Sequence, residues 1–384
     1  MVQLPTVGNP GAVHAGAARV EVLDLLRMLA ALAVVLFHYG FTGPAAHSIS
    51  DLAPPAIVEI AKYGYLGVPL FFVISGFVIA YSAEGRTATD FAIARATRIY
   101  PGFLFCMTLT FLAMLAFGGP HLEPSMAQWV ANIFIFAPAL KQHYLDTVYW
   151  TIVSEITFYA WVWLMMLGWL FKRRIDLIVL AWLLLSLLNE IVVGSFAVHN
   201  ILLTDQSGFF AAGLLLHEMF RGRKDASVQC LFGLATACAV LQALIDVREM
   251  RGRLMTDFND WIVATTCLAA IIAVMLAVRV RRVPLPPGFI VAVGGLTYPL
   301  YLLHQNIGHL AFQQLEHLAR PSVLVPMIVI GIIVASWAVW RYVERPGQRL
   351  MKIGLVQLAR RFGLATAASR AAKPADLRSR TAMS

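Results

Sequence analysis

Long apolar stretches recur along the whole chain, and short polar or basic segments separate them. A helix of about 20 mostly apolar residues crosses the hydrocarbon core of a bilayer. The pattern therefore predicts an all-α, polytopic membrane protein of about ten transmembrane helices. The predicted spans lie near residues 22–42, 64–82, 99–118, 149–171, 175–193, 205–220, 228–246, 260–278, 288–312 and 322–343.

One further apolar stretch, residues 129–140, is too short to cross a bilayer. It runs into Lys141, Gln142, His143 and Asp146, and so we expect a re-entrant or interfacial segment there. Composition agrees with a membrane location, because 59% of the residues are hydrophobic and 13% are charged. Such a chain cannot cover itself with polar surface as a soluble globule does.

The distribution of basic residues predicts the orientation of the spans. With both termini in the cytoplasm, the inside segments hold 24 of the 30 lysines and arginines, and the outside loops hold 6. This division satisfies the positive-inside rule. Counting 129–140 as a full span would move Lys172, Arg173 and Arg174 to the outside, and we reject that topology.

Three regions follow from this layout: residues 1–20 as a cytoplasmic N-terminal segment, 21–350 as the transmembrane domain, and 351–384 as a basic, partly disordered cytoplasmic tail that contacts anionic membrane lipid. The net charge of +9 reflects topology. The basic clusters are separate loop flanks without interleaved aromatics, so nucleic acid is not an expected partner. The cysteines lie in apolar stretches without metal-ligand spacing, and no metal site is expected. They are Cys106, Cys230, Cys238 and Cys267.

Candidate chemistry begins in the first predicted span, where Arg27 and His38 are eleven residues apart with only apolar residues between them. Eleven residues make about three helical turns, so both side chains lie on one face, about 16 Å apart. An arginine at the rim and a histidine at depth indicate a long ligand that is anionic at the surface. The alternatives are an interfacial arginine paired with Asp24 and a histidine that only packs between helices.

A pair of arginines precedes the third span. Arg95 and Arg98 are three residues apart, just before Ile99, Tyr100 and Pro101. We expect them at a helix N-terminus, where guanidinium groups and free N–H groups can bind phosphate. The alternative is an ordinary basic flank of a membrane span.

Other polar groups lie inside predicted spans, where each is costly unless it serves a partner or a function. Ser75 lies among small residues of the second span and also suits helix packing. Glu155, about two turns into the fourth span, could orient the histidine of the first span, bind substrate hydroxyls or link two helices. Tyr298, Tyr301 and His304 form a stripe that could line a substrate cleft.

These motifs occur in an order that resembles the integral-membrane acyltransferase type 3 family over about residues 20–350. The matching motifs are Arg27 with His38, the helix from Phe71 to Phe77, Arg95 with Arg98, Trp150 with Glu155, the run Tyr298, Tyr301, Leu302 and His304, and Glu344-Arg345-Pro346. Any one of them is weak evidence, whereas the ordered set is specific. One departure is Thr297 where the family usually has serine, which retains the hydroxyl.

The resemblance implies a bacterial inner-membrane O-acyltransferase that moves an acetyl or other short acyl group from acyl-CoA to a hydroxyl of a polysaccharide, glycolipid or other glycosylated small molecule. It implies catalytic roles for His38, Arg27 and Glu155, and acetyl-CoA binding by Arg95, Arg98 and Arg27. Tyr298, His304 and Ser75 are then expected at the substrate. Some family members carry a C-terminal esterase-like domain, which we do not expect here.

Two alternatives from other classes remain at this point. Buried histidine, glutamate and arginine also mark the pathway of a proton-coupled transporter of a sugar or lipid-linked substrate. Such transporters often show two matching halves with broken helices, and no internal repeat is visible in the sequence. A non-catalytic scaffold of a polysaccharide-export complex would not require the arginines and the histidine together.

Overall fold

Helices make up every regular element in the part of the chain that the computed structural model describes, which is residues 20–42, 55–119, 122–168, 170, 175–280 and 282–364. The prediction of an all-α protein is confirmed for these residues. The α-helices are α1 Glu21–Phe37, α3 Pro55–Ala61, α4 Gly67–Ala83, α5 Ala88–Phe117, α6 Met126–Ile133, α7 Trp150–Leu167, α9 Ile175–Leu188, α10 Phe196–Leu202, α11 Ser207–Phe220, α12 Ala226–Leu254, α13 Asp260–Val280, α14 Pro287–Leu303, α15 Asn306–Leu315, α16 Pro321–Val339 and α17 Arg345–Arg361.

The predicted number of about ten spans is not confirmed, although each of the ten predicted segments contains helix. Within the described residues, eight helices are long and apolar enough to cross a membrane, and a ninth span results if the bent pair α14 and α15 is counted as one. The remaining predicted segment, 205–220, corresponds to α11, which has only 14 residues. At 1.5 Å per residue such a helix is shorter than the hydrocarbon core.

The stretch at 129–140 forms two short pieces, α6 and a 3₁₀ turn at Ala137–Leu140. Neither is long enough to span a bilayer. Asn132 joins them to the following loop: its side-chain Nδ2 donates to the carbonyl of His143 at 3.0 Å, and its Oδ1 accepts from the backbone N–H of Leu145 at 3.2 Å. The stretch is therefore a non-spanning element that packs beside α5.

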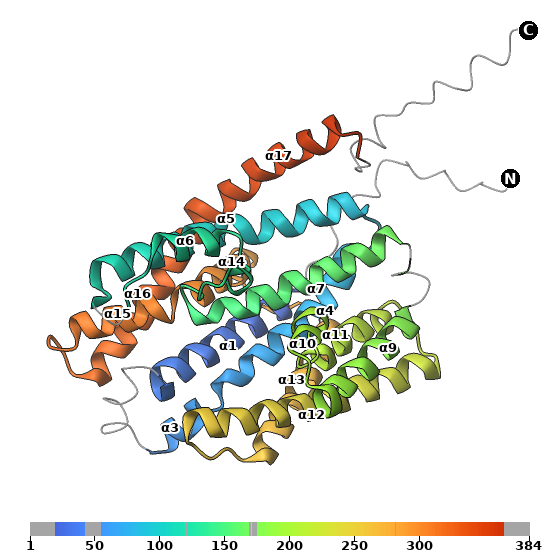
Figure 1. Ribbon diagram of the computed structural model, residues 1–384, viewed down its shortest axis with the longest axis horizontal. Helices are drawn as coiled ribbons and strands as arrows, with labels where there is room; N and C mark the ends of the chain where they lie inside the picture. The colour runs from blue at the N-terminus through green and yellow to red at the C-terminus, as the bar shows by residue number, and fades with distance from the viewer. Residues whose placement is uncertain are drawn as a thin grey trace, which may run out of the picture.

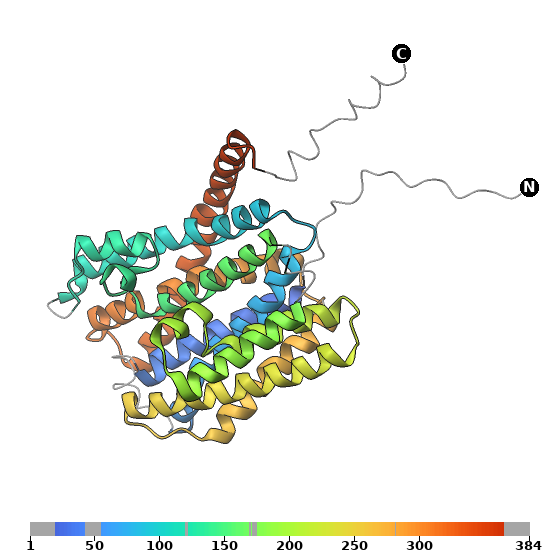
Figure 2. The ribbon, with the colours of Figure 1, turned by 45° about the vertical axis from the view of Figure 1, so that its right-hand side comes forward.

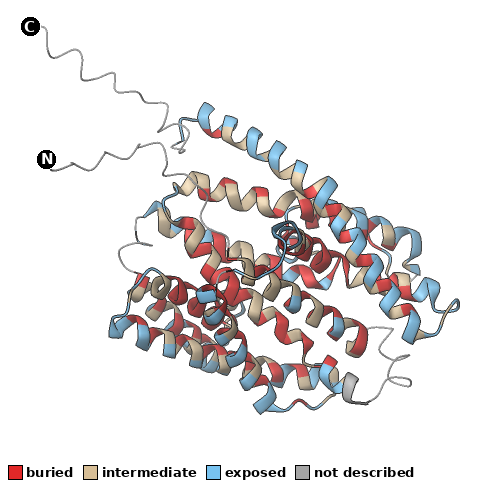
Figure 3. Cartoon of the chain, turned by 180° about the vertical axis from the view of Figure 1, so that it is seen from behind, coloured by how far each residue is buried: buried red, intermediate tan, exposed pale blue. Residues whose placement is uncertain are grey.

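The inner helices of the bundle are α1, α4, α11 and α14. Helix α1 packs against α4, α13 and α14, and α4 packs against α11. In Figure 1, α5 and α17 lie on one side of α1 and α4, and α12 and α13 lie on the other; the turned view in Figure 2 keeps this order. Buried residues concentrate on the inner helices, whereas outer helices expose large apolar side chains such as Leu112, Ile272 and Ile330 (Figure 3). An apolar exterior is typical of a protein surrounded by lipid.

Glycines permit a close contact between α4 and α11. A Cβ atom built on Gly76 of α4 would lie 2.2 Å from the carbonyl oxygen of Phe210, and one on Gly213 of α11 would lie 2.2 Å from that of Val73. Each helix therefore approaches the backbone of the other, as small residues allow in membranes. The small residues of the second predicted span favour such packing, and the structure identifies α11 as the partner.

A break separates α14 from α15, and the two helices meet at 68°. The loop before α7 holds this break in place. The backbone N–H of Asn306 donates to Asp146 Oδ2 at 3.0 Å, and the Asn306 side chain donates to the carbonyl of Leu145 at 2.7 Å. These bonds satisfy backbone and side-chain groups that the break would otherwise leave unpaired.

The C-terminal part of the described chain is one 41-residue helical stretch, Pro321–Arg361, interrupted by a π-helical turn at Trp340–Glu344. Helix α17 thus continues to Arg361, past the boundary expected at residue 350. The rest of the predicted tail, residues 365–384, and most of the predicted N-terminal segment lie outside the described residues.

Candidate functional site

Three arginines line a small cavity of about 260 Å³ between α1, α4, α5, α7 and α14. Arg27 comes from α1, and Arg95 and Arg98 come from α5. Arg27 lies 3.7 Å from the carboxylate of Asp24 and keeps 26% of its side chain exposed. Tyr298 of α14 lines the same cavity. Arg27 and Tyr298 are more than two hundred positions apart in the sequence, and the fold brings them together.

The two arginines of α5 differ in their partners. Arg98 donates to the carboxylate of Glu344, whose side chain is 1% exposed. Arg95 forms no ion pair with a described residue, and its Nε atom is buried without a hydrogen-bond partner. Its guanidinium lies 5.7 Å from the ring centroid of Tyr159. A buried donor without a partner is costly, and so Arg95 is free to bind an anion in the cavity.

The expectation that these arginines lie at a helix N-terminus is wrong. Helix α5 begins at Ala88, where Thr87 caps it by accepting from the N–H of Asp90. Arg95 and Arg98 lie in the second and third turns, and therefore no free backbone N–H groups join them. Any anion binding here depends on the guanidinium groups alone.

Glu155 of α7 lies in the same small cavity. Its Oε1 accepts from Ser75 Oγ at 3.3 Å and from the hydroxyl of Tyr159. Tyr298 also lines this cavity and donates to the carbonyl of Ile99 at 3.3 Å. Ser75, Glu155 and Tyr298 thus gather around the arginines, as a shared site requires. Glu155 lines the cavity of the arginines and not the cavity that contains His38.

A larger cavity of about 610 Å³ contains His38. Helix α1 ends at Phe37, and His38 begins a π-helical turn that continues to Thr42. The Nδ1 atom of His38 lies 3.3 Å from the hydroxyl of Thr42. Widened turns of this kind often occur at functional sites, and this one directs His38 to the cavity wall.

Two further histidines surround His38. The ring centroid of His304 lies 5.2 Å away and that of His309 lies 6.4 Å away. His304 is fully buried and lines neither cavity; its Nδ1 lies 2.8 Å from the carbonyl of Tyr301, and its Nε2 has no hydrogen-bond partner. Tyr39 donates to the His304 carbonyl. The predicted contact of His304 with substrate stays a prediction, and the geometry places this side chain behind His38.

The two cavities are adjacent. Val68 of α4 and Tyr301 of α14 line both of them. Arg27 lines the small cavity, and His38, about three helical turns further along the chain, lines the large one. The two residues that the sequence places eleven positions apart therefore lie in two neighbouring cavities.

Sequence reasoning missed the roles of two residues at this site. Glu344 was noted only as part of a motif, but it is the buried partner of Arg98, and Gln348 donates to it at 2.8 Å. An acidic residue at the end of a predicted span was the signal. His309 lines the large cavity, and its Nε2 lies 3.4 Å from the carbonyl oxygen of His38. The available signal was a second histidine in the predicted span 288–312, five residues after His304.

Comparison with known proteins agrees with this arrangement. A family model described as an acyltransferase domain matches residues 20–341. Nodulation protein 10 of Rhizobium leguminosarum bv. viciae is 23% identical over 371 residues, which cover 89% of this chain and 96% of that protein. No solved structure matches the chain significantly.

Two other relatives match shorter parts of the chain. An O-acetyl transferase of Shigella phage Sf6 is 32% identical over 89 residues, 23% of this chain and 25% of that protein. Acyltransferase MdmB of Streptomyces mycarofaciens is 28% identical over 149 residues, 37% of this chain and 38% of that protein.

The helical bundle and its apolar exterior are those of an integral membrane protein. The family model and the acyltransferase relatives show that it is an O-acyltransferase. The chain belongs to the acyltransferase family whose model covers residues 20–341.

Proposed function

We propose that this protein transfers an acetyl or other short acyl group from acyl-CoA to a hydroxyl of a carbohydrate or other glycosylated acceptor. The observation that carries this proposal is the pair of adjacent cavities, one lined by three arginines and the other by His38. A relative named as an O-acetyl transferase supports a hydroxyl as the group that is acylated.

The small cavity suits an anionic donor such as acetyl-CoA, whose phosphates pair well with guanidinium groups. Arg95 has a buried donor without a partner, which a phosphate oxygen would satisfy. A volume of about 260 Å³ lies at the low end of ligand pockets. The cavity therefore takes in only part of the donor, with the phosphates at Arg27, Arg95 and Arg98 and the acyl-thioester arm pointing toward Tyr301.

His38 lines the cavity opposite the arginines and therefore meets the acceptor rather than the phosphates. It acts as general base: its ring nitrogen takes the proton of the acceptor hydroxyl while the oxygen attacks the thioester carbonyl. A C–O bond forms, the C–S bond breaks, and the CoA thiolate leaves and takes the proton from the His38 imidazolium, which restores the neutral base. A positioned base contributes about 10²–10⁴-fold to the rate. His304, packed behind His38, holds the ring in place.

The orientation follows from where acyl-CoA is made. The donor is cytoplasmic, and so the arginine cavity opens to the cytoplasm of a bacterial inner membrane and the His38 cavity opens to the opposite side. With α11 counted as a crossing, the division of lysines and arginines is 24 inside and 6 outside, which supports this orientation through the positive-inside rule.

Replacement of His38 by alanine tests the proposal. We expect His38→Ala to lower acyl transfer by about 10²-fold or more, with unchanged protein level in the membrane. The measurement is alkali-labile label from radioactive acetyl-CoA in glycans and lipids of inverted membrane vesicles. His317→Ala is the matched control, because His317 is exposed and lines neither cavity. Retention of activity within a few-fold of the wild type would exclude His38 as the base.

A second measurement separates a base from an acyl carrier. If His38 took the acyl group itself, radioactive acetyl-CoA would label the purified protein when no acceptor is present. We expect no stable label on the wild-type protein under these conditions. Label that appears on the wild type and disappears in His38→Ala would replace the general-base role with a covalent one.

A further inference from the structure

The larger cavity differs from the arginine cavity in the sign of its charge. Two carboxylates line it, Asp205 in the loop before α11 and Asp246 of α12, and Arg253 is its only arginine or lysine among the described lining residues. The small cavity holds three arginines and a single glutamate, Glu155. The two adjacent cavities thus differ in the charge of their lining residues, and Val68 and Tyr301 lie between them.

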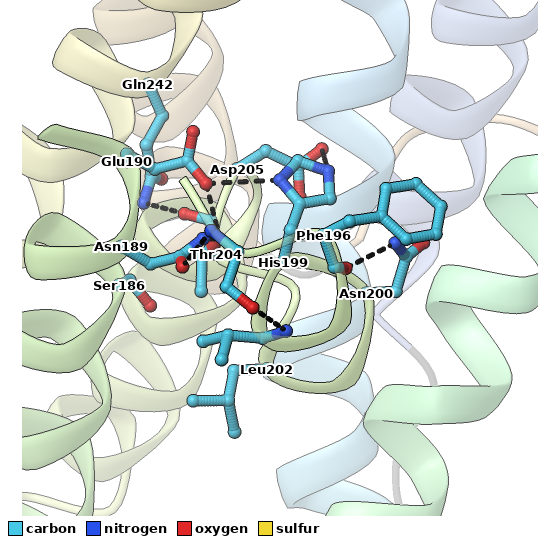
Figure 4. A network of polar contacts seen from close by, with 12 residues as sticks. Ser186, Asn189, Glu190, Phe196, His199, Asn200, Leu202, Thr204, Asp205 and Gln242 are labelled. Atoms are coloured by element: carbon cyan, nitrogen blue, oxygen red, sulfur yellow. Dashed lines mark hydrogen bonds and ion pairs between the residues drawn. The ribbon is translucent and has the colours of Figure 1, made fainter. Parts of the chain in front are cut away.

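A hydrogen-bonded network fixes the position of Asp205 (Figure 4). Gln242 of α12 donates to the carbonyl of Thr204 at 2.6 Å and accepts from the N–H of Gly208 at 2.9 Å. His199 lies 3.7 Å from the Asp205 carboxylate, and Gln206 donates to it at 3.0 Å. The loop at 204–208 is therefore tied to α12, and Asp205 and Gln206 are held at the cavity wall.

One polar group without a hydrogen-bond partner lines the same cavity. The hydroxyl oxygen of Tyr65 is buried and has no hydrogen-bond partner, and Asp246 lies close enough to Tyr65 to interact with it electrostatically. A buried hydroxyl without a partner costs about 1–3 kcal/mol, which a hydroxylated ligand would recover. Trp150, which also lines the cavity, adds an aromatic surface.

We propose that the His38 cavity is an acceptor site that selects carbohydrates without negative charge, whether neutral or amino-bearing, and rejects acidic ones, because Asp205 and Asp246 both face it. This inference rests on the proposed function. Carboxylates bind sugar hydroxyls and ammonium groups as hydrogen-bond acceptors, and they repel carboxylate or phosphate substituents. Opposite charges also keep the two substrates apart: phosphates favour the arginine cavity, and an uncharged or cationic acceptor favours the other.

The sign of the charge in the cavity can be measured without knowing the acceptor. Met250 lines the cavity one turn after Asp246 on α12, and side chains four residues apart on a helix are neighbours. The four native cysteines are replaced by alanine and Met250→Cys is introduced. The purified protein then reacts with two thiol reagents of equal size, cationic trimethylammonioethyl methanethiosulfonate and anionic sulfonatoethyl methanethiosulfonate. The ratio of the two rates is compared with that at Leu318→Cys, an exposed position outside the cavity.

We expect the cationic reagent to be favoured at Met250→Cys. Adding Asp246→Asn should slow the cationic reagent and speed the anionic one by up to about fivefold each, the effect of one unit charge at about 4 Å in water, and so the ratio of the two rates should fall by up to roughly twenty-five-fold. Glu249→Gln is the matched control, because Glu249 is exposed on the same helix and does not line the cavity. An unchanged ratio of the two reaction rates in Asp246→Asn overturns the assignment of negative charge to the cavity. An equal change of this ratio in Glu249→Gln also overturns it, and both results hold whatever the acyltransferase activity of the variants.

The acceptor class is tested with radioactive acetyl-CoA and three probes: oligomers of glucosamine, of N-acetylglucosamine and of galacturonic acid. We expect label in the first two only, and a several-fold higher KM for the glucosamine oligomer in Asp246→Asn with the KM for acetyl-CoA unchanged. Preference for the galacturonic acid oligomer overturns the proposal. If no label is transferred to any probe or to native envelope glycans, the proposed function is contradicted. If the ratio of the two thiol-reaction rates is nevertheless as expected, the negative charge of the cavity is still supported.

Discussion

Arg95 and Arg98 differ in whether a carboxylate already neutralises them, and this difference decides how each substitution should behave. Arg98 pairs with the buried Glu344, whereas Arg95 pairs with no described residue and has a buried Nε without a partner. Arg98 therefore contributes to folding as well as to the cavity. Arg95 is available to a ligand.

We predict that Arg95→Ala weakens donor binding about ten- to a hundred-fold, because a charge-assisted hydrogen bond contributes about 1.5–3 kcal/mol, and leaves the melting temperature unchanged. Arg98→Ala should also lower the melting temperature, because an unpaired buried carboxylate costs about 3–5 kcal/mol. Calorimetry with coenzyme A and thermal unfolding in detergent measure the two effects.

The double variant Arg98→Ala with Glu344→Gln serves as the control for this difference. Removal of the second charge should restore most of the melting temperature without restoring donor binding. If Arg95→Ala and Arg98→Ala lose equal stability, the assignment of the buried ion pair to Arg98 alone is wrong.

At the scale of the elements, the contact between α4 and α11 depends on two glycines. We predict that Gly76→Ala prevents folding or lowers the melting temperature sharply, because its Cβ would lie 2.2 Å from the carbonyl oxygen of Phe210. Gly233→Ala is the control: a Cβ there meets nothing within 4 Å, and alanine favours a helix by about 1 kcal/mol over glycine. Size-exclusion chromatography and thermal unfolding would compare them. Equal behaviour of the two variants would rule out the close approach.

The stability of the folded protein should depend on pH through Asp146, which binds the break between α14 and α15. Asp146 lies just before the span Thr147–Leu167. Burial raises the pKa of Asp146 from 3.8 to about 6, although the N–H groups of Asn306 and Val148 oppose this shift. The folded protein therefore binds this proton more tightly than the unfolded chain does. Its contribution to stability is full below about pH 4 and is lost as the pH rises through about 6.

We predict that the melting temperature in detergent falls between pH 4.5 and pH 7 and that Asp146→Asn removes part of this fall, because asparagine does not titrate. Asp257→Asn is the control, since the Asp257 side chain is fully exposed. A pH dependence that is the same in the wild type and Asp146→Asn would show that this carboxyl does not titrate in the range.

At the scale of the whole molecule, the donor assignment requires the arginine cavity to open to the cytoplasm. We predict that a cysteine at Arg86, in the loop between α4 and α5, resists an impermeant thiol reagent in intact cells and reacts after lysis. With α11 counted as a crossing, a cysteine at Asp257, in the loop between α12 and α13, should react in intact cells. Both residues are exposed, and native cysteines are replaced first. Reaction of the Arg86 position from outside would place the arginines on the wrong side for a cytoplasmic donor.

Hydropathy alone determined the class of the protein and the positions of its helices. A helix in lipid satisfies its own backbone, and so a long apolar run is sufficient to predict one. The number of spans was less certain, because α11 is short and buried among other helices and the segment 288–312 contains a break. Both features depend on neighbours that hydropathy does not describe.

The spacing of Arg27 and His38 was also predictable, because the rise of a helix is fixed. Only the tertiary structure decided that these residues line two adjacent cavities, that Glu344 pairs with Arg98 across 246 positions, and that Asp205 and Asp246 line the cavity of His38 rather than that of the arginines. Ion pairs and cavities arise from side chains on different helices. Their partners are determined by how the helices pack and by how closely glycines such as Gly76 allow them to approach, which the sequence of a single segment does not specify.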